Sequence, residues 1–183
     1  MEKKQQEADM KNKAGNLLSW VASSAVLIGI DQYTKALAVA RLKNQQPFVI
    51  LDGVFEFLYS ENRGAAFGLM QGRQGFFFLI GIVVLAVAGY TMLRMPGWQE
   101  KRYHWLKLCV IMITAGAVGN MIDRVSQGYV VDFLYFKLIN FPIFNVADIY
   151  VTTATALLFV VLCFYYKEEE LDIFRFSKKG EAH

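Results

Sequence analysis

The sequence predicts an α-helical membrane protein with four transmembrane helices, both termini on the cytoplasmic side, and a small β-sheet on the outer face. Composition gives the first indication, because 55% of the 183 residues are hydrophobic, only 19% are charged, and the mean hydropathy is +0.32. The second indication is the grouping of apolar residues into four blocks, and the third is the uneven distribution of Lys and Arg between them. We expect residues 1–183 to form one integral membrane domain.

Four apolar blocks are long enough to cross a bilayer, whose hydrocarbon core of roughly 30 Å needs about 20 helical residues. They cover about 17–40, 76–93, 105–122 and 149–166. The second and fourth blocks are uniformly apolar, whereas the first and third contain polar residues. Because a charged side chain at the bilayer centre costs about 2.5 to 3.5 kcal/mol, those polar residues are candidates for a function.

The basic residues set the expected orientation, since short cytoplasmic segments carry an excess of Lys and Arg. Eleven lie in the N-terminal tail (1–16), the link between the second and third spans, and the C-terminal tail (167–183), against six in the other two segments. Both tails are therefore expected to be solvated cytoplasmic ends. This topology accounts for the basic residues, so the net charge of +3 calls for no nucleic-acid partner.

A removable signal peptide is the alternative interpretation of the N-terminus, which combines a basic start, an apolar run and small residues. Asp31 and Lys35 interrupt that apolar run, and about 40 residues is long for such a signal. We therefore expect a first transmembrane helix that stays in the protein.

The segment 41–75 contains two β-prone runs around Asp52-Gly53, a pair that suits a type I′ hairpin turn. In the second run, aromatic residues alternate with Glu56 and Ser60, so one face is expected to lie on lipid or protein and the other to meet water. The segment 129–136, YVVDFLYF, either adds to this sheet or forms a short interfacial element. Both alternatives stay open at this point.

The third span is rich in small residues, with Ala115 and Gly119 in the spacing that allows close helix contact. Cys109 and Cys163 both fall inside predicted spans, which argues against a disulfide framework or a CxxC metal site. We expect no metal or organic cofactor.

Two polar groups in the spans admit a structural and a functional interpretation. Asp31 and Lys35 lie four residues apart on one helix face, where they either neutralise each other or place Lys35 near a lipid phosphate or a carboxylate. Asn120, Asp123 and Arg124 share a face at the end of the third span. By themselves, Asp123 and Arg124 suggest an interfacial ion pair.

Two acids in the apolar segment Gly128–Val151 are the main candidates for chemistry. Asp148 directly precedes the last span, where a carboxylate caps exposed backbone amides. Asp132 has no such explanation, since an acid in the context VVDF needs a partner or a raised pKa. Two carboxylates that share one proton can hold a water, which the ionised acid deprotonates while the protonated acid polarises a carbonyl. That is the chemistry of an aspartic peptidase.

Other mechanisms have less support in the sequence. The two histidines are His104, in a predicted cytoplasmic link, and His183, so neither a Ser-His pair nor an HExxH zinc site is available on the outer side. A Ser-Lys pair remains, with Lys35 as base and Ser60 or Ser126 as nucleophile, but it leaves the two acids unexplained. Two further alternatives are a small proton-linked carrier, which predicts more acids deep in the spans, and a non-catalytic membrane assembly factor.

Five short blocks occur in a characteristic order relative to the four spans. They are DQYTK (31–35), NRGAAFG (62–68), GNMIDR (119–124), GYVVDF (128–133) and FPIFNVAD (141–148). Together they resemble lipoprotein signal peptidase, also called signal peptidase II. The resemblance implies an aspartic peptidase of the bacterial plasma membrane that cleaves the signal peptide from prolipoproteins just before the lipid-modified cysteine, with its active site near the outer face.

By this resemblance, Asp132 and Asp148 form the catalytic dyad. The other implied site residues orient the acids, hold the substrate backbone or support the site: Asn62, Gly64, Asn120, Asp123, Arg124, Asn145, Asp31 and Lys35. The expected sheet matches the family's substrate cradle, and the expected partners are a lipid-modified prolipoprotein and membrane phospholipid. One departure is Ile149, where the family often has a small or hydroxyl residue.

The surroundings of the two acids suggest which one carries the shared proton. Apolar neighbours such as Val131 and Phe133 exclude water and raise the pKa of one acid. The positive end of the last helix favours Asp148 as the ionised partner. Asp132 is then expected to be the protonated one.

Overall fold

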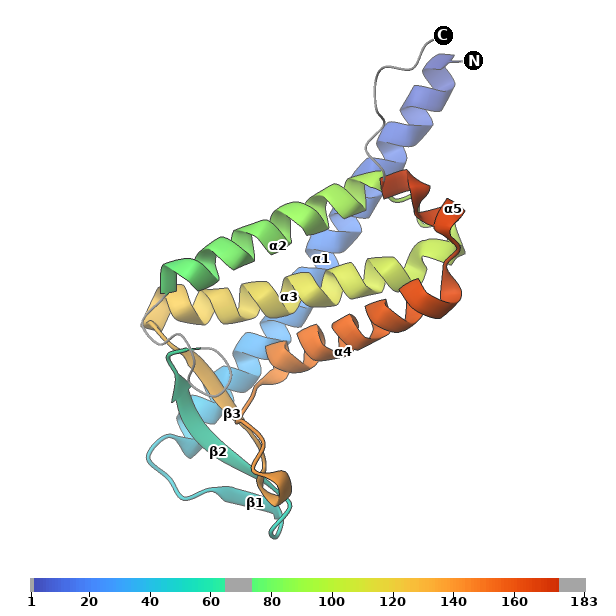
Figure 1. The fold of residues 1–183 in the computed structure, drawn as a ribbon. Helices are drawn as coiled ribbons and strands as arrows, with labels where there is room; N and C mark the ends of the chain where they lie inside the picture. Colours follow the sequence, from blue (N-terminus) through green and yellow to red (C-terminus); the bar gives the residue numbers. More distant parts are fainter. Residues whose placement is uncertain (1, 65–73, 175–183) are drawn as a thin grey trace.

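The structure is a computed structural model that describes residues 2–64 and 74–174. The main elements, in chain order, are α1 (Glu2–Leu42), β1 (Phe48–Leu51), β2 (Phe55–Asn62), α2 (Gln74–Arg94), α3 (His104–Gln127), β3 (Val130–Phe136), α4 (Val146–Val160) and α5 (Glu168–Leu171). The sheet lies at one end of the helix bundle, and the first turns of α1 lie at the other end, together with α5 (Figure 1).

Four helical segments in this described part of the chain are long and apolar enough to cross a membrane. They are Lys3–Leu42, Gly75–Arg94, Lys101–Gln127 and Val146–Tyr165. The predicted number and order of spans are confirmed. The first three helices extend beyond the predicted apolar blocks at both ends, and the fourth begins earlier, at Val146, and ends at Tyr165.

The stretch before residue 17, expected to be solvated, continues α1 as helix. Its last residue, Asn16, is fully buried. Asn16 Nδ2 donates at 2.8 to 3.3 Å to three carbonyl oxygens at the end of α2, those of Met92, Met95 and Pro96. Carbonyls at a helix C-terminus lack intrahelical donors, so Asn16 supplies from α1 the donors that α2 cannot provide.

Helix α3 packs against the other three long helices, and small residues bring it close to them. A Cβ at Gly116 would lie 2.5 Å from the carbonyl oxygen of Ala147 in α4, and one at Gly119 would lie 2.5 Å from Asp31 Oδ2 in α1. Larger side chains would push these helices apart. The close contact predicted from the small residues of the third span is therefore confirmed.

The sheet is antiparallel with strand order β1-β2-β3. The predicted hairpin at Asp52-Gly53 is confirmed, and the Val54 N–H donates to Leu51 O at 3.0 Å across it. The predicted type I′ turn is wrong. Gly53 has φ of 68°, but Asp52 is not among the described residues with positive φ, and a type I′ turn needs positive φ at both positions.

The segment 129–136 supplies the third strand, β3, which pairs with β2 so that Ser60 lies opposite Asp132. The expectation that Glu56 meets water is wrong, because its side chain is buried. Lys137 Nζ donates to Glu56 Oε2 at 3.0 Å, which supplies the partner that a buried carboxylate needs. Both faces of β2 are therefore at least half-buried, and neither is open to water in the way the alternation predicted.

After α4 the chain turns back onto the bundle. Arg102 Nε pairs with Glu170 Oε1 at 2.7 Å, and Arg94 Nε donates to Ile173 O at 2.8 Å. The expected exposure holds for Lys167, Glu168, Glu169 and Asp172, but the tail is also anchored to the bundle through Glu170 and Ile173. Arg94 and Arg102, two basic residues between the second and third spans, therefore hold this segment. Residues 175–183 lie outside the described residues.

Candidate active site

The two aspartates of the apolar segment Gly128–Val151 come together where the sheet meets the bundle. Asp132 lies on β3 and is 2% exposed, and Asp148 lies in the first turn of α4 and is half-buried. Strand β3 brings the first acid to the ends of the helices, and the start of α4 brings the second. The chain between them folds back, since Phe144 pairs with Leu134 of β3.

Asn145 binds both acids. Its Nδ2 donates to Asp132 Oδ1 at 2.6 Å, and its backbone N–H donates to Asp148 Oδ2 at 3.1 Å. Asn145 is also the N-cap of α4, because its Oδ1 accepts the N–H of Asp148 at 3.1 Å and completes a capping box. The prediction that Asp148 caps the helix is wrong. It is the third residue of the helix, where its side chain reaches back to the cap.

Two further amides bind the remaining oxygens of the two acids. Asn62 Nδ2 donates to Asp132 Oδ2 at 2.9 Å, and Asn120 Nδ2 donates to Asp148 Oδ1 at 2.9 Å. Each of the four carboxylate oxygens therefore has one donor from an asparagine. Because these donors are neutral, they fix the positions of the acids without cancelling their charge.

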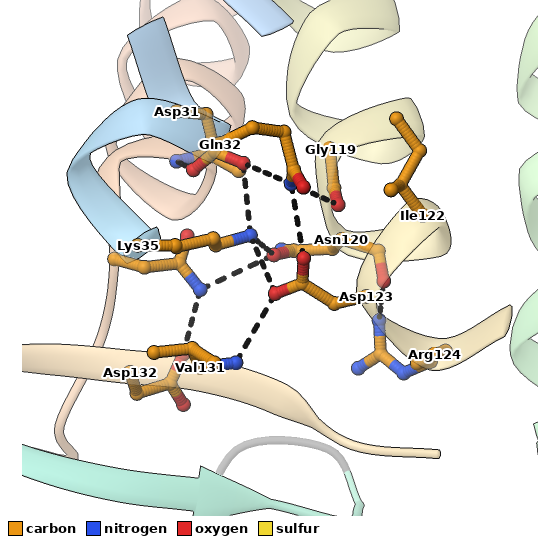
Figure 2. A network of polar contacts seen from close by, with 12 residues as sticks. Asp31, Gln32, Lys35, Gly119, Asn120, Ile122, Asp123, Arg124, Val131 and Asp132 are labelled. Atoms are coloured by element: carbon orange, nitrogen blue, oxygen red, sulfur yellow. Dashed lines mark hydrogen bonds and ion pairs between the residues drawn. The ribbon is translucent and has the colours of Figure 1, made fainter. Parts of the chain in front are cut away.

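A buried charge network lies behind Asn120 (Figure 2). Lys35 is 3% exposed, and its Nζ lies 2.9 Å from Asp31 Oδ2 and 3.1 Å from Asp123 Oδ2. The same Nζ donates to Asn120 Oδ1 at 2.9 Å. The amide oxygen of Asn120 thus faces the cation, which turns its nitrogen toward Asp148. The interpretation of Asp31 and Lys35 as a neutralising pair is correct, with a second acid added from α3.

The two acids of this network also hold the backbone beside the candidate dyad. Asp31 Oδ1 accepts the N–H of Ala147 at 2.9 Å, and Asp123 Oδ2 accepts the N–H of Val131 at 3.1 Å. Ala147 directly precedes Asp148, and Val131 directly precedes Asp132. Each acid of the network therefore fixes the residue before one of the two site aspartates.

The suggested Asp123–Arg124 ion pair is wrong, since the two side chains have different partners. Arg124 Nη2 donates to Gly64 O at 3.2 Å, and its guanidinium lies 4.5 Å from the centroid of the Phe77 ring. The Gly64 N–H in turn donates to Asn62 Oδ1 at 3.0 Å. Arg124 and Gly64 thus position the amide that binds Asp132. Ala65 to Gly68 of the same motif lie outside the described residues.

Gln32 also belongs to the site, although it is not among the predicted site residues. Its Nε2 lies within hydrogen-bond distance of Asp31 Oδ2 (3.2 Å), Gly119 O (3.1 Å) and Asp123 Oδ1 (2.9 Å), as Figure 2 shows. Gln32 therefore links α1 to α3 beside Lys35. The signal was available, because Gln32 is a polar residue inside a predicted span and next to Asp31.

The Ser-Lys alternative finds no support in the described residues. The contacts of Lys35 Nζ are with two carboxylates and one amide, while the Ser126 hydroxyl donates to Ile122 O at 2.8 Å. Ile149, the departure from the family pattern, has an exposed side chain, and its backbone N–H donates to Asn145 O at 3.3 Å. The structure therefore leaves the bonds to Asp148 independent of that side chain.

Burial decides the electrostatics of Asp132. It raises the pKa of Asp132 to about 7, and the nearby charge of Asp148 acts in the same direction. Hydrogen bonds from Asn62 and Asn145 and the charge of Lys35 oppose the shift. Near neutral pH this acid can therefore both hold and release a proton.

The sequence matches the family described as signal peptidase (SPase) II over residues 23–164, which is more than half of the chain. The chain belongs to the signal peptidase II family. A lipoprotein signal peptidase of Streptococcus thermophilus is 40% identical over 143 residues, which cover 78% of this chain and 89% of that protein. One from Symbiobacterium thermophilum is 42% identical over 145 residues, which cover 78% and 92%.

A structural neighbour agrees with this membership of the signal peptidase II family. A solved bacterial membrane enzyme is similar with a TM-score of 0.68 and 28% sequence identity, covering 90% of this chain and 93% of that one. This chain is thus a multi-pass membrane peptidase by family, and the matched residues 23–164 contain the acids and amides described above.

Proposed function

We propose that this signal peptidase II family member removes the signal peptide from diacylglyceryl-modified prolipoproteins and cleaves before the lipidated cysteine. The observation that carries the mechanism is the joint binding of Asp132 and Asp148 by Asn145. Two acids on separate elements share one amide side chain and its backbone, an arrangement that holds a carboxyl pair around a water. The 40% identical relative carries the name of the same activity.

In the proposed reaction, Asp148 is ionised and Asp132 is protonated. Asp148 takes a proton from the water, whose oxygen attacks the scissile carbonyl carbon, while Asp132 donates a proton to the carbonyl oxygen. The tetrahedral intermediate then collapses. The proton held by Asp148 passes to the leaving amine, the C–N bond breaks, and Asp132 recovers its proton from the intermediate. Burial of Asp132 supports this assignment, since it favours the neutral acid.

We further propose that both termini face the cytoplasm and that the sheet lies at the outer face of a bacterial plasma membrane. The excess of Lys and Arg in the tails and the second link supports this orientation. The lipid anchor of the substrate keeps the scissile bond near the membrane surface, and the two aspartates lie where the sheet joins the helix ends. We propose that the spans and the sheet act as one domain.

The test is cleavage of a diacylglyceryl-modified prolipoprotein by the detergent-purified protein. Asp132→Asn and Asp148→Asn should each lower kcat by at least about 1000-fold, because each acid transfers a proton in the transition state. Asp52→Asn, an exposed acid at the hairpin turn of the same sheet, is the matched control and should cleave normally. Full cleavage by either variant would overturn the assignment of Asp132 and Asp148 as the catalytic dyad. No cleavage by the parent protein would favour the carrier alternative.

A further inference from the structure

A groove at the end of the bundle opposite the sheet is a second candidate for ligand binding. It lies between α1 and the start of α3 and has a volume of about 740 Å³. That volume is in the range of pockets that bind small molecules in proteins, roughly 300 to 1,000 Å³. The groove shares no lining residue with the site around Asp132 and Asp148.

The walls of the groove are apolar. Val26 and Leu27 of α1 face Leu108 and Ile111 of α3 across it. Lys101 and Ile111 are separated by roughly 15 Å along the helix axis. The groove therefore extends from the helix end into the membrane-spanning part. Val26 is 64% exposed and belongs to a span. Its neighbours in a membrane are therefore lipid chains rather than water.

The mouth of the groove carries positive charge. Lys101 is exposed and lines the mouth together with His104, and no residue in the described part of the chain forms an ion pair with Lys101. Lys107 is buried behind the lining, with Nζ 2.7 Å from Pro96 O and 4.6 Å from the centroid of the ring of Trp98, which lines the mouth. The described lining contains no acid, so every formal charge on it is positive.

Two tryptophans complete the mouth, since Trp98 and Trp105 both line it and both are more than one-third exposed. Tryptophan favours the depth of the lipid headgroups, where its ring meets apolar chains and its N–H meets polar groups. The mouth is therefore at headgroup depth and the apolar walls are at chain depth. A ligand that fits both has a negative head and an apolar tail.

We propose that this groove binds one anionic phospholipid, with its phosphate at Lys101 and His104 and an acyl chain along Val26 and Leu108. A soluble anion would gain nothing from the apolar walls, and an uncharged lipid would gain nothing from the lysine. The proposal needs the membrane-spanning fold but not the proposed catalysis, because the groove lies at the other end of the bundle.

Thermal unfolding of the full-length protein in an uncharged detergent tests the proposal. Phosphatidylglycerol at about 100 times its Kd should raise Tm by about 5 to 10 °C. Phosphatidylcholine with the same chains and at the same concentration should give about two-thirds of that rise, and glycerol 3-phosphate should give none. Equal shifts with the two lipids would overturn the role of charge. A shift with glycerol 3-phosphate would indicate a soluble-anion site, and no shift with phosphatidylglycerol would also refute the proposal.

Paired variants separate lipid binding from folding. Lys101→Gln should weaken phosphatidylglycerol binding about fivefold, the effect of one basic residue beside an anionic lipid. Val26→Trp, which fills the groove, should abolish the lipid-dependent rise in Tm. The controls Lys11→Gln and Val21→Trp change exposed residues of α1 outside the groove lining. Tm is measured for each variant with and without lipid. If the lipid raised Tm equally in a variant and in its control, the proposed lipid site would be wrong.

Discussion

The two ends of the helix bundle bury polar side chains for different purposes. At the sheet end, buried charged side chains bind one another, as when Lys35 contacts Asp31 and Asp123, and these two acids also accept backbone N–H groups. At the opposite end, side chains bind backbone carbonyls, as when Asn16 donates to the end of α2. The first arrangement sets the orientation of groups suited to proton transfer. The second completes hydrogen bonds that a helix end lacks, so equal burial does not imply equal function.

The largest expected effect concerns the cation of the sheet end. Lys35→Met leaves Asp31 and Asp123 buried without their cation, so we expect a loss of about 3 to 5 kcal/mol in the free energy of unfolding. The carboxamide of Asn120 also loses the contact that orients it, so kcat should fall in the molecules that remain folded, with little change in KM. Unfolding by denaturant and single-turnover cleavage measure the two effects.

Lys43→Met is the matched control for that variant, because Lys43 also pairs with a carboxylate at the sheet end but is exposed. Equal destabilisation by the two substitutions would contradict a special role for burial. Adding Asp31→Asn to Lys35→Met should restore part of the stability, since it removes one of the unpaired charges. Failure of this rescue would count against the charge network as the cause.

The second prediction concerns pH. The folded-state pKa of Asp132 is raised to about 7, above the value of about 3.9 in an unfolded chain, so folding favours the protonated acid. The stability that this proton supplies is complete below pH of about 4 and is lost as pH rises through about 7. Asp132→Asn should flatten this dependence, which unfolding curves between pH 4 and 8 can measure.

The rate of cleavage should depend on the same proton of Asp132. If Asp132 is the protonated partner, kcat should fall about tenfold per pH unit above about 7. A rate that stays constant to pH 9 would assign the essential proton to another group. Both proposed catalytic acids lie at the sheet end. Asn16→Ala, at the opposite end, should therefore leave this pH profile unchanged.

The third prediction weakens the opposite end. Asn16→Ala removes a donor to three carbonyls, two of them buried, and we expect it to lower the free energy of unfolding by about 1 to 3 kcal/mol. Cleavage per folded molecule should not change. Gln5→Ala, an exposed amide earlier in α1, should have no effect on either measurement. A loss of kcat in Asn16→Ala at full folding would show that the two ends are coupled.

The smallest effect is expected for the exposed pair of Lys43 and Glu61, whose atoms lie 3.1 Å apart. Surface ion pairs stabilise folded proteins by about 0 to 1 kcal/mol, so Lys43→Met should change stability by less than 1 kcal/mol. A salt titration of the parent and the variant checks this value. A larger, salt-sensitive loss would mean that the sheet depends on surface charge as well as on buried contacts.

The sequence was sufficient for the spans, the hairpin and the grouping of the acids, because each of these depends on local pattern or on residue types that are costly in a membrane. Asp31 with Lys35 was accessible from spacing alone. The partnership with Asp123 was not, because it depends on how α1 packs against α3 at Gly119. The choice between a strand and an interfacial element for 129–136 likewise needed the pairing with β2.

The errors share a physical cause, namely competition between partners that the sequence does not rank. Asp148 and Asn145 both qualify as a helix cap, and Asn145 takes the cap while the acid occupies the third helical position. Glu56 fits a water-facing site until Lys137 arrives from a later segment. The anchoring of the C-terminal segment was missed for the same reason, because Glu170 pairs with Arg102, which lies more than sixty residues earlier in the chain.

The capping of α4 has a consequence for how this protein exchanges hydrogen with solvent. Amides in the first turn of a helix usually exchange quickly, because they have no carbonyl partner within the helix. Here the amide of Ala147 is bound by Asp31 and that of Asp148 by Asn145. Deuterium uptake at these two amides is thus expected to be slow while the site is assembled. It would rise as soon as either side chain moves away, so isotope exchange at this one helical turn reports the integrity of the site without any substrate.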